Sequence, residues 1–381
     1  MKRVVQAGTV VAVLAIGITP AVNAEASVPH WKLAKTYKSS VKNGYASATA
    51  VEAFGGKDAW AFSADLYEGK RLPKPRAEHW NGKTWRGVAL PKGLWGGVFS
   101  VQRSSPTNVW AVGGSDLKGN NGPGSYAMRW NGKKWAVAKK WKDGVSSVTV
   151  ISPTNVWVFG VGGADTGAGT WHFNGKTWTR VRPFGNNELA SASAASARLM
   201  WATGREGLLA RYNGSKWSRV SLGKLLPPAI PHHEGKPSRT IDFSAVRAFS
   251  ASQVWVTGRI SDDDGKDHYK TTSFLLNWNG KAWRRVGVPA NWLIGWRKID
   301  SDGAGGLWID GWAGREGRGG SLIQHRSRSG KWTAAPLRVA GRTASIRQFS
   351  HIPGTKSLWA VGEVRPTNNS WSTGALWRLY A

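Results

Sequence analysis

Short runs in which apolar and polar residues alternate recur along most of the chain. "GGVFSVQRSS" and "GVSSVTVIS" are typical, because apolar side chains occupy alternate positions and each run ends in a Ser, Pro or Asn turn. Side chains of a β-strand point to opposite faces in succession, so a period of two predicts a half-buried strand. The pattern therefore predicts an all-β chain of short strands.

One of these strands is repeated seven times around a tryptophan. The copies read "KDAWAFS", "TNVWAVG", "TNVWVFG", "RLMWATG", "SQVWVTG", "GGLWIDG" and "KSLWAVG". Their tryptophans are Trp60, Trp110, Trp157, Trp201, Trp255, Trp308 and Trp359. Successive copies are 44 to 54 residues apart. A repeat of this length is the signature of a repeat architecture and decides the fold before any other feature.

A second element follows the tryptophan strand in each of the first six copies. It has the form "RWNGKKWAVA", in which Asn-Gly separates two apolar runs, and Ser-Gly replaces Asn-Gly in the sixth copy. Asn-Gly between apolar runs is a strong hairpin signal, typical of a type I′ turn with positive φ at both central residues. We therefore expect a tight hairpin of this kind in each repeat.

One repeat thus contains an inner strand, the tryptophan strand, a third strand and a fourth strand after the hairpin. Four antiparallel strands in a repeat of this length are typical of a propeller blade. The seventh copy ends at "GALWRLYA" without a fourth strand, whereas "PHWKLAKTY" near the N-terminus matches one, with Trp31 in the place of Trp85. We predict an all-β, seven-bladed β-propeller of four-stranded antiparallel blades, its ring closed by the N-terminal strand in the last blade.

The blade motif resembles a known family. "VWAVGG", followed by an aromatic third strand and "WNGKKWAVA", is similar to kelch-type blades, as in the propeller of galactose oxidase-like proteins, over residues 29 to 381. The double glycine of that pattern is present only at Gly113-Gly114. The chain has no Cys for a thioether cofactor and no copper-ligand set. The resemblance implies a propeller of the secreted bacterial type, without a cofactor, and fold alone assigns no chemistry.

The N-terminus and the charge predict where the protein acts. Lys2 and Arg3, the apolar run from Val4 to Ile18 and the small residues before Ala24 have the form of a secretory signal peptide. We expect a leader over residues 1–24 and one propeller over residues 25–381, secreted and extracellular, without membrane insertion. With 53 basic and 22 acidic residues, the formal charge is +31, which favours anionic partners.

The chain has 25 tryptophans, and 18 of them fall at repeated positions. These 18 are predicted to pack between blades. Seven do not fit the pattern and lie in or beside the variable connections between second and third or fourth and first strands. The seven surplus tryptophans are Trp95, Trp141, Trp171, Trp292, Trp296, Trp312 and Trp371. Because variable loops on a rigid scaffold commonly bind ligands, they are the candidate ligand-binding residues.

Three functions are compatible with these features. The first is a secreted, non-catalytic, lectin-like propeller that binds a cell-wall or extracellular glycan, or another anionic polymer, through these tryptophans. The second is a protein-interaction scaffold or adaptor of a secreted assembly, and the third is a polysaccharide-active hydrolase or lyase. Sequence-specific nucleic-acid binding has no supporting motif. We expect a monomer.

Titratable residues give no catalytic or metal signature. Asp262, Asp264 and Asp267 have incomplete spacing for a calcium loop, so a solvated loop is favoured. His232 and His233 are adjacent in a proline-rich connection, where side chains point in opposite directions, and a surface loop is again favoured. A glycosidase needs two carboxylates, and seven acidic residues of the variable loops are candidates. They are Asp65, Glu68, Asp116, Asp165, Glu206, Glu316 and Glu363.

Overall fold

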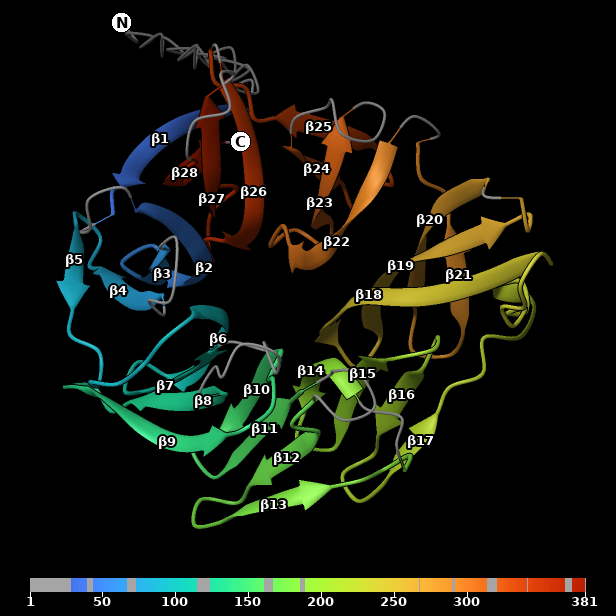
Figure 1. Ribbon diagram of the computed structural model, residues 1–381, viewed down its shortest axis with the longest axis horizontal. Coiled ribbons are helices and arrows are strands. Elements are labelled where there is room, and N and C mark those ends of the chain that lie inside the picture. The colour runs from blue at the N-terminus through green and yellow to red at the C-terminus, as the bar shows by residue number, and fades with distance from the viewer. Residues whose placement is uncertain are drawn as a thin grey trace, which may run out of the picture.

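The computed structural model is a ring of four-stranded β-sheets around a central axis (Figure 1). It describes residues 29–39, 44–66, 73–114, 124–160, 167–185, 189–266, 268–289, 292–313, 321–340, 342–366 and 372–380. The predicted leader lies outside these residues. Among the described residues the one helical element is the 3₁₀ turn η1 (Gly223–Leu225). No helix in these segments is long and apolar enough to cross a bilayer.

Each blade is an antiparallel meander that runs outward from the axis. Blade 1 contains β2 (Tyr45–Gly55), β3 (Asp58–Leu66), β4 (Lys74–Trp80) and β5 (Trp85–Val88). Blade 2 contains β6 (Gly97–Ser105), β7 (Asn108–Gly114), β8 (Ser125–Trp130) and β9 (Trp135–Trp141). Blade 3 contains β10 (Ser147–Ser152), β11 (Asn155–Phe159), β12 (Thr170–Phe173) and β13 (Trp178–Val181). Blade 4 contains β14 (Leu189–Ser196), β15 (Leu199–Gly204), β16 (Leu209–Tyr212) and β17 (Trp217–Arg219).

The remaining blades complete the circle. Blade 5 contains β18 (Ser238–Ser250), β19 (Gln253–Asp263), β20 (Tyr269–Trp278) and β21 (Trp283–Val286). Blade 6 contains β22 (Trp292–Ser301), β23 (Leu307–Ala313), β24 (Ser321–Arg326) and β25 (Trp332–Pro336). Blade 7 contains β26 (Arg342–His351), β27 (Leu358–Pro366), β28 (Thr373–Tyr380) and β1 (His30–Tyr37). Blades 7 and 1 are joined into one sheet by a single parallel bridge between Ala46 and Thr373.

Ring closure by the N-terminal strand is confirmed. β1 pairs antiparallel with β28, with Trp31 opposite Leu379 and Tyr37 opposite Gly374. The indole Nε1 of Trp31 donates a hydrogen bond to the carbonyl oxygen of Ala335 in blade 6, at 3.2 Å. The strand therefore occupies the fourth position of blade 7 and contacts blade 6. Its pairing covers the outer edge of β28, which would otherwise be an unpaired sheet edge.

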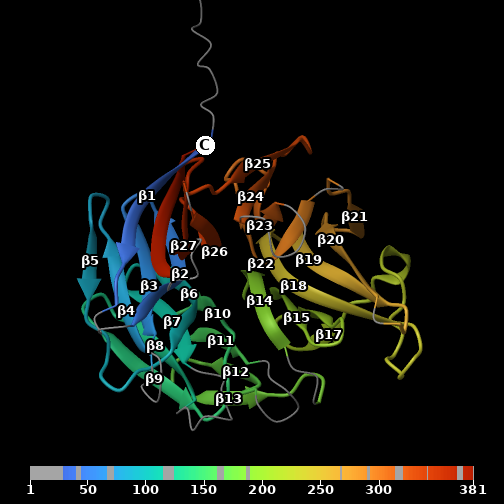
Figure 2. The same ribbon diagram turned by 45° about the horizontal axis from the view of Figure 1, so that its top comes forward.

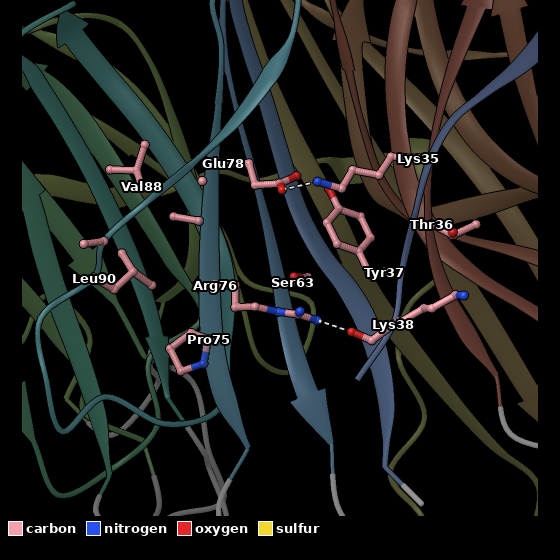
Figure 3. Close-up of a pocket in the computed structure, with 13 residues that line it drawn as sticks. Lys35, Thr36, Tyr37, Lys38, Ser63, Pro75, Arg76, Glu78, Val88 and Leu90 are labelled. Atoms are coloured by element: carbon pink, nitrogen blue, oxygen red, sulfur yellow. Dashed lines mark hydrogen bonds and ion pairs between the residues drawn. The ribbon is translucent and has the colours of Figure 1, made fainter. Parts of the chain in front are cut away.

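On its other side β1 faces blade 1 across a cavity of about 660 Å³ (Figure 3). Lys35 forms an ion pair with Glu78, and the guanidinium of Arg76 donates to the carbonyl oxygen of Lys38 at 3.1 Å. Burial raises the pKa of the Tyr37 hydroxyl well above its ordinary value, and the nearby Glu78 carboxylate adds to the effect. These contacts hold the first strand of the chain against both neighbouring blades.

The tryptophans at repeated positions form one contact that recurs around the ring. Trp60 of blade 1 is 1% exposed and lies against Trp130 and Trp135 of blade 2, with ring centroids 5.1 and 5.0 Å away. All seven second-strand tryptophans are buried. The equivalent contacts are Trp110 with Phe173 and Trp178, Trp157 with Tyr212 and Trp217, Trp201 with Trp278 and Trp283, and Trp359 with Trp80 and Trp85. In each of these contacts the tryptophan packs against the following blade, as predicted.

The Asn-Gly hairpins are tight, but the expected type I′ geometry is wrong. Gly82 has φ +96°, whereas Glu206 is the one non-glycine residue with positive φ in the described part of the chain, so Asn81 keeps a negative φ. The side-chain oxygen of Asn81 accepts hydrogen bonds from the backbone N–H of Lys83 and of Thr84, each at 3.0 Å. This Asx-type contact closes a four-residue loop between Trp80 and Trp85, so only the glycine needs the left-handed conformation.

Candidate functional site

The two ends of the ring differ in their connections. The Asn-Gly hairpins pack against the short turns between first and second strands, since a Cβ on Gly132 would lie 2.8 Å from Thr107 and one on Gly175 would lie 2.6 Å from Thr154. Both kinds of short turn therefore share one end of the ring, which we call the turn face. Because neighbouring strands of a blade are antiparallel, the second and fourth strands end at the other end of the ring, which we call the loop face; Figure 2 shows the blades from a tilted direction.

Three of the seven surplus tryptophans lie around β9. Trp141 ends that strand, Trp171 lies in β12 of the next blade, and their ring centroids are 6.1 Å apart. Lys139 places its ammonium 4.3 Å from the ring centre of Trp171 and 5.7 Å from that of Trp141. Lys140 lies 5.1 Å from the ring of Trp95. We call these five residues the aromatic patch.

The indole N–H groups of Trp95 and Trp171 bond to backbone carbonyl groups. Nε1 of Trp95 donates to the carbonyl oxygen of Gly124 at 3.1 Å, and Nε1 of Trp171 donates to that of Ala168 at 2.7 Å. Trp95 and Trp171 are half-buried, whereas Trp141 is 8% exposed and belongs to the core between blades 2 and 3. The surfaces left for a ligand are therefore the ring faces of Trp95 and Trp171 and the two ammonium groups.

Three further surplus tryptophans lie elsewhere on the ring. Trp292 and Trp296 are in β22, and Trp312 is in β23, both strands of blade 6. Blade 6 is separated from blades 2 and 3 by other blades on either side (Figure 1). Trp371 lies outside the described residues. The fold thus brings Trp141 of β9 and Trp171 of β12 together. It places Trp95 beside Lys140, on the other side of β9 from Lys139, because consecutive residues of a strand point to opposite faces. The blade 6 tryptophans lie apart from all three.

The central channel is lined by polar residues that join neighbouring blades. The inner-strand residue opposite each buried tryptophan is polar: Glu52, Gln102, Thr149, Ser193, Arg247, Asp300 and Ser350. Ser350 accepts from the backbone N–H of Ala53 in blade 1 at 3.0 Å, and Ser193 accepts from that of Ala248 in blade 5 at 3.0 Å. These side chains satisfy inner-strand backbone groups that a sheet neighbour does not reach. Most of the channel polarity is therefore structural.

Three of these seven residues carry charge, and a fourth charged side chain, Lys298, lines the same channel. The ammonium of Lys298 donates to Glu52 at 2.7 Å, which links blade 6 to blade 1 across blade 7. Arg247 lies 3.4 Å from Asp300, whose second oxygen accepts from the backbone N–H of His351 at 2.9 Å. Burial raises the pKa of Glu52 even though Lys298 opposes the shift. Two acids and two bases balance one another beside a cavity of about 280 Å³.

A larger groove of about 830 Å³ lies on the loop face between blades 4 and 5. Its walls are the connection Val220–His232, the turn Arg205–Gly207 and the first half of β18. Glu206, with φ +53°, is one of the lining residues. The sequence indicated only a surface loop here. Although the cluster of three prolines among Leu, Ile and Val was visible, the groove depends on β18 lying beside that connection, and no local pattern predicts this.

The candidate acids do not form a catalytic pair in the described structure. Asp65 is buried against the guanidinium of Arg76, 2.7 Å away, and Glu363 is held by Arg347 and Ser47. Glu206 lies apart from both, at the groove. The other four, together with Asp267, lie outside the described residues. No cluster of metal-binding side chains occurs among the described positions, and the exposed His232 and His233 belong to the surface connection.

Comparison with known proteins identifies the fold but no family. No family model matches the sequence, and no curated protein matches it. The structure is similar to YCF48 bound to D1 peptide, with a TM-score of 0.52 and 11% identity over 92% of this chain and 96% of that one. YCF48 from Cyanidioschyzon merolae gives a TM-score of 0.50 and 14% identity over 92% and 98%. A variant of the Aleuria aurantia lectin in complex with α-methyl-L-fucoside gives 0.40 and 12% over 79% and 98%.

The chain is a β-propeller. Five separate four-stranded sheets and one eight-stranded sheet, which is two blades joined by a single bridge, make seven blades. The fold class predicted from the repeats is therefore confirmed. The more specific kelch-type resemblance stays a prediction.

Proposed function

We propose that this protein is an exported, non-catalytic binding propeller that holds an anionic glycan of a cell wall or extracellular polymer on the aromatic patch. The observation that carries the proposal is the pairing of half-buried indoles with lysines. Trp171 lies under Lys139 at 4.3 Å, and Trp95 lies under Lys140 at 5.1 Å. The two pairs flank β9, since its consecutive residues Lys139 and Lys140 point to opposite faces of the sheet.

The chemistry of the patch fits a sugar that carries an acidic group. An indole face attracts ammonium groups and is a flat apolar surface for the C–H groups of a pyranose ring. Lys139 and Lys140 place positive charge beside these surfaces, where a carboxylate, sulfate or phosphate substituent would replace the ring as the partner of the ammonium. The indole N–H groups of Trp95 and Trp171, the two half-buried rings, already have backbone partners, so recognition by these rings would rest on stacking and charge.

The global charge supports the same class of ligand. A formal charge of +31 attracts polyanions from a distance and raises association rates at low salt. Export through the N-terminal leader is part of the proposal, since it would place the propeller among wall and matrix polymers. The global charge alone would not select a binding position or a sugar ring. The aromatic patch would provide both, because its indole faces can stack on a pyranose ring at one position.

Titration of intrinsic tryptophan fluorescence with polygalacturonate, a polymer of uronic acid, tests the proposal, with dextran as the neutral control. Trp171→Ala is expected to weaken binding about two- to tenfold, the equivalent of one aromatic contact. Lys139→Gln is expected to weaken it about two- to fivefold, the scale of an exposed charge pair. Circular dichroism of each variant checks that it remains folded.

The matched control is Lys133→Gln, which removes the same charge from an exposed hairpin of the turn face. Equal losses for Lys133→Gln and Lys139→Gln would show that the polymer binds by net charge alone, and the proposal would then be wrong. Absence of binding to a panel of acidic glycans would favour the protein-interaction function. YCF48, which shares the fold, is a protein for which a bound peptide is reported. Release of shortened polymer would favour a hydrolase or lyase.

A further inference from the structure

A second cavity between blade 7 and blade 1 lies at the turn face, where the first and last strands of the ring meet the hairpin between β4 and β5. Its volume is about 390 Å³, and it is lined by residues of β1, β28 and that hairpin. This size is within the range of about 300 to 1,000 Å³ that is typical of small-molecule sites. The cavity shares no residue with the aromatic patch around β9.

The charged residues of this cavity are all basic. The described residues that line it include no acid, and the basic ones are Lys32, Lys35, Lys83 and Arg378. Lys35 is neutralised by its ion pair with Glu78. None of the ion pairs between described residues involves Lys32, Lys83 or Arg378. The cavity is therefore positively charged and favours an anionic ligand.

The sheet holds two of these cations close together. Lys32 of β1 lies directly opposite Arg378 of β28 in the antiparallel register. Opposed residues of such a pair extend to the same face with Cβ atoms about 4.5 to 5.5 Å apart, and like charges at these positions destabilise the pairing. The strand pairing that closes the ring thus brings two positive charges together, and an anion beside them would offset their repulsion.

Aromatic rings position the Arg378 side chain. Its guanidinium carbon lies 5.4 Å from the ring centre of Trp359 and 4.6 Å from that of Tyr380. Its Nε is buried and has no hydrogen-bond partner among the described residues. Stacking uses the flat faces of a guanidinium and leaves its N–H groups, which lie in the plane, for an acceptor such as a phosphate oxygen. Trp80 and Tyr380, both half-buried, add ring surface to the wall.

We propose that this cavity binds a small ring compound that carries a phosphate monoester. The phosphate would lie among Lys32, Lys83 and Arg378, and the ring would stack on Trp80 or Tyr380. A phosphate monoester carries about 1.5 to 2 negative charges at neutral pH, which matches these cations better than the single charge of a carboxylate or a sulfate ester.

Binding at this position would also strengthen the closure of the ring. The ligand would contact β1 and β28 of blade 7 and the hairpin of blade 1 at the same time. A ligand that binds the folded state and not the unfolded state stabilises the fold by mass action. The site is independent of the glycan proposal, since it lies at the other end of the ring from the aromatic patch.

Isothermal titration calorimetry of the whole protein with phenyl phosphate tests the ligand class. Phenyl phosphate should bind saturably, and phenyl sulfate, which has one charge on the same ring, should bind about two- to fivefold more weakly. Inorganic phosphate, which has no ring, should bind about two- to tenfold more weakly. Absence of saturable binding by phenyl phosphate, or equal affinity for either of the other two compounds, would overturn the proposal.

Lys83 has a matched control in Lys133, which follows Asn-Gly at the same position of the blade 2 hairpin. Lys83→Gln should weaken the binding of phenyl phosphate about two- to fivefold, as an exposed charge pair would. Lys133→Gln removes the same charge from the protein and should leave binding unchanged, as should Trp171→Ala in the aromatic patch. Equal losses for Lys83→Gln and Lys133→Gln would show attraction by net charge alone, and the proposal would be wrong.

Thermal denaturation locates the ligand at the closure of the ring. Phenyl phosphate should raise the melting temperature of the unaltered protein. The rise should be smaller in a variant that combines Lys32→Gln with Lys83→Gln. Both lysines are exposed, so these substitutions leave the packing between blades intact. An equal rise in the double variant would mean that the ligand binds elsewhere, which would overturn the assignment of the site.

Discussion

The junction between blades 1 and 2 and the aromatic patch use the same side chain in two different environments. At the junction, Trp60 is 1% exposed and surrounded by rings of the next blade. In the patch, Trp95 and Trp171 are half-buried, donate their N–H groups to loop carbonyls and lie beside lysines. The difference shows that the same residue type packs fully between blades at a second-strand position and is left half-buried beside a connection.

Trp60→Ala gives the sharpest contrast. Removing a fully buried indole between two blades should lower the free energy of unfolding by about 3 to 5 kcal/mol, through lost burial and the cavity that remains. Urea denaturation followed by circular dichroism measures the loss. Trp95→Ala is the matched control and should cost far less, since its ring is already partly in water. Equal losses for the two variants would contradict the distinction between junction and patch.

Trp31→Ala tests the junction that is closed by the N-terminal strand. The indole packs partly buried against blade 6 and donates one hydrogen bond to Ala335. Its loss should reduce the free energy of unfolding by about 2 to 3 kcal/mol, less than at a fully buried junction. Lys32→Ala, at the exposed neighbouring position, should have little effect. A denaturation midpoint unchanged by Trp31→Ala would show that β1 is not required to hold the ring closed.

Asn81→Ala tests the turn face. The change removes the acceptor of two backbone N–H groups in an exposed loop, and we expect a loss of about 1 kcal/mol, similar to that of a capping side chain. Thermal denaturation compared with Lys83→Ala, in the same loop, isolates the effect of the side-chain oxygen. A loss no larger than that of Lys83→Ala would mean that the glycine alone shapes the hairpin.

The smallest effect is expected at Glu363, which links blade 7 to Ser47 of blade 1. Burial alone raises its pKa, but the hydrogen bond from Ser47 and the charge of Arg347 outweigh burial, so the pKa lies below its ordinary value of 4.5. A depressed folded-state pKa gives stability that is present above the unfolded value and is lost as the pH falls through the folded value.

Glu363→Gln should therefore lower the free energy of unfolding at neutral pH by less than about 1 kcal/mol, because Arg347 is partly exposed. The melting temperature should fall correspondingly. This difference from the unaltered protein should shrink as the solution is acidified below pH 4.5. Melting curves across acidic and neutral pH measure it, with the exposed Glu234→Gln as control. A difference that grows on acidification would reverse the assigned direction of the shift.

Most of the fold was predictable because its determinants are local and repeated. The period of two defines the strands, and the tryptophan at one fixed position in each repeat predicts the buried contact that recurs between blades. Even ring closure was visible, since Trp31 has the same sequence context as Trp85. The hairpin type was not predictable, because the side chain of Asn81 satisfies the loop amides in a way that the dipeptide preference does not include.

The candidate sites were only partly predictable. Trp95, Trp141 and Trp171 were recognised as surplus, but the contact of Trp141 with Trp171 and the position of Trp95 beside Lys140 depend on how blades 1, 2 and 3 pack side by side. The hydrogen bonds of the polar residue opposite each buried tryptophan could not be predicted from the local sequence, because the bonding partner belongs to another blade. The groove was missed, since a proline-rich loop shows no sign of which strand edge lies across from it.

The sequence by itself determined the strands, the number of blades, the closure of the ring and the burial of the repeated tryptophans. Each of these follows from alternation along one strand or from the same contact repeated at every blade. Only the tertiary structure decided which surplus side chains meet, which charges balance in the channel and which connection lies across the groove from β18. Those features join residues that are far apart in the chain and unrelated by the repeat, so their positions follow from the packing of the whole ring.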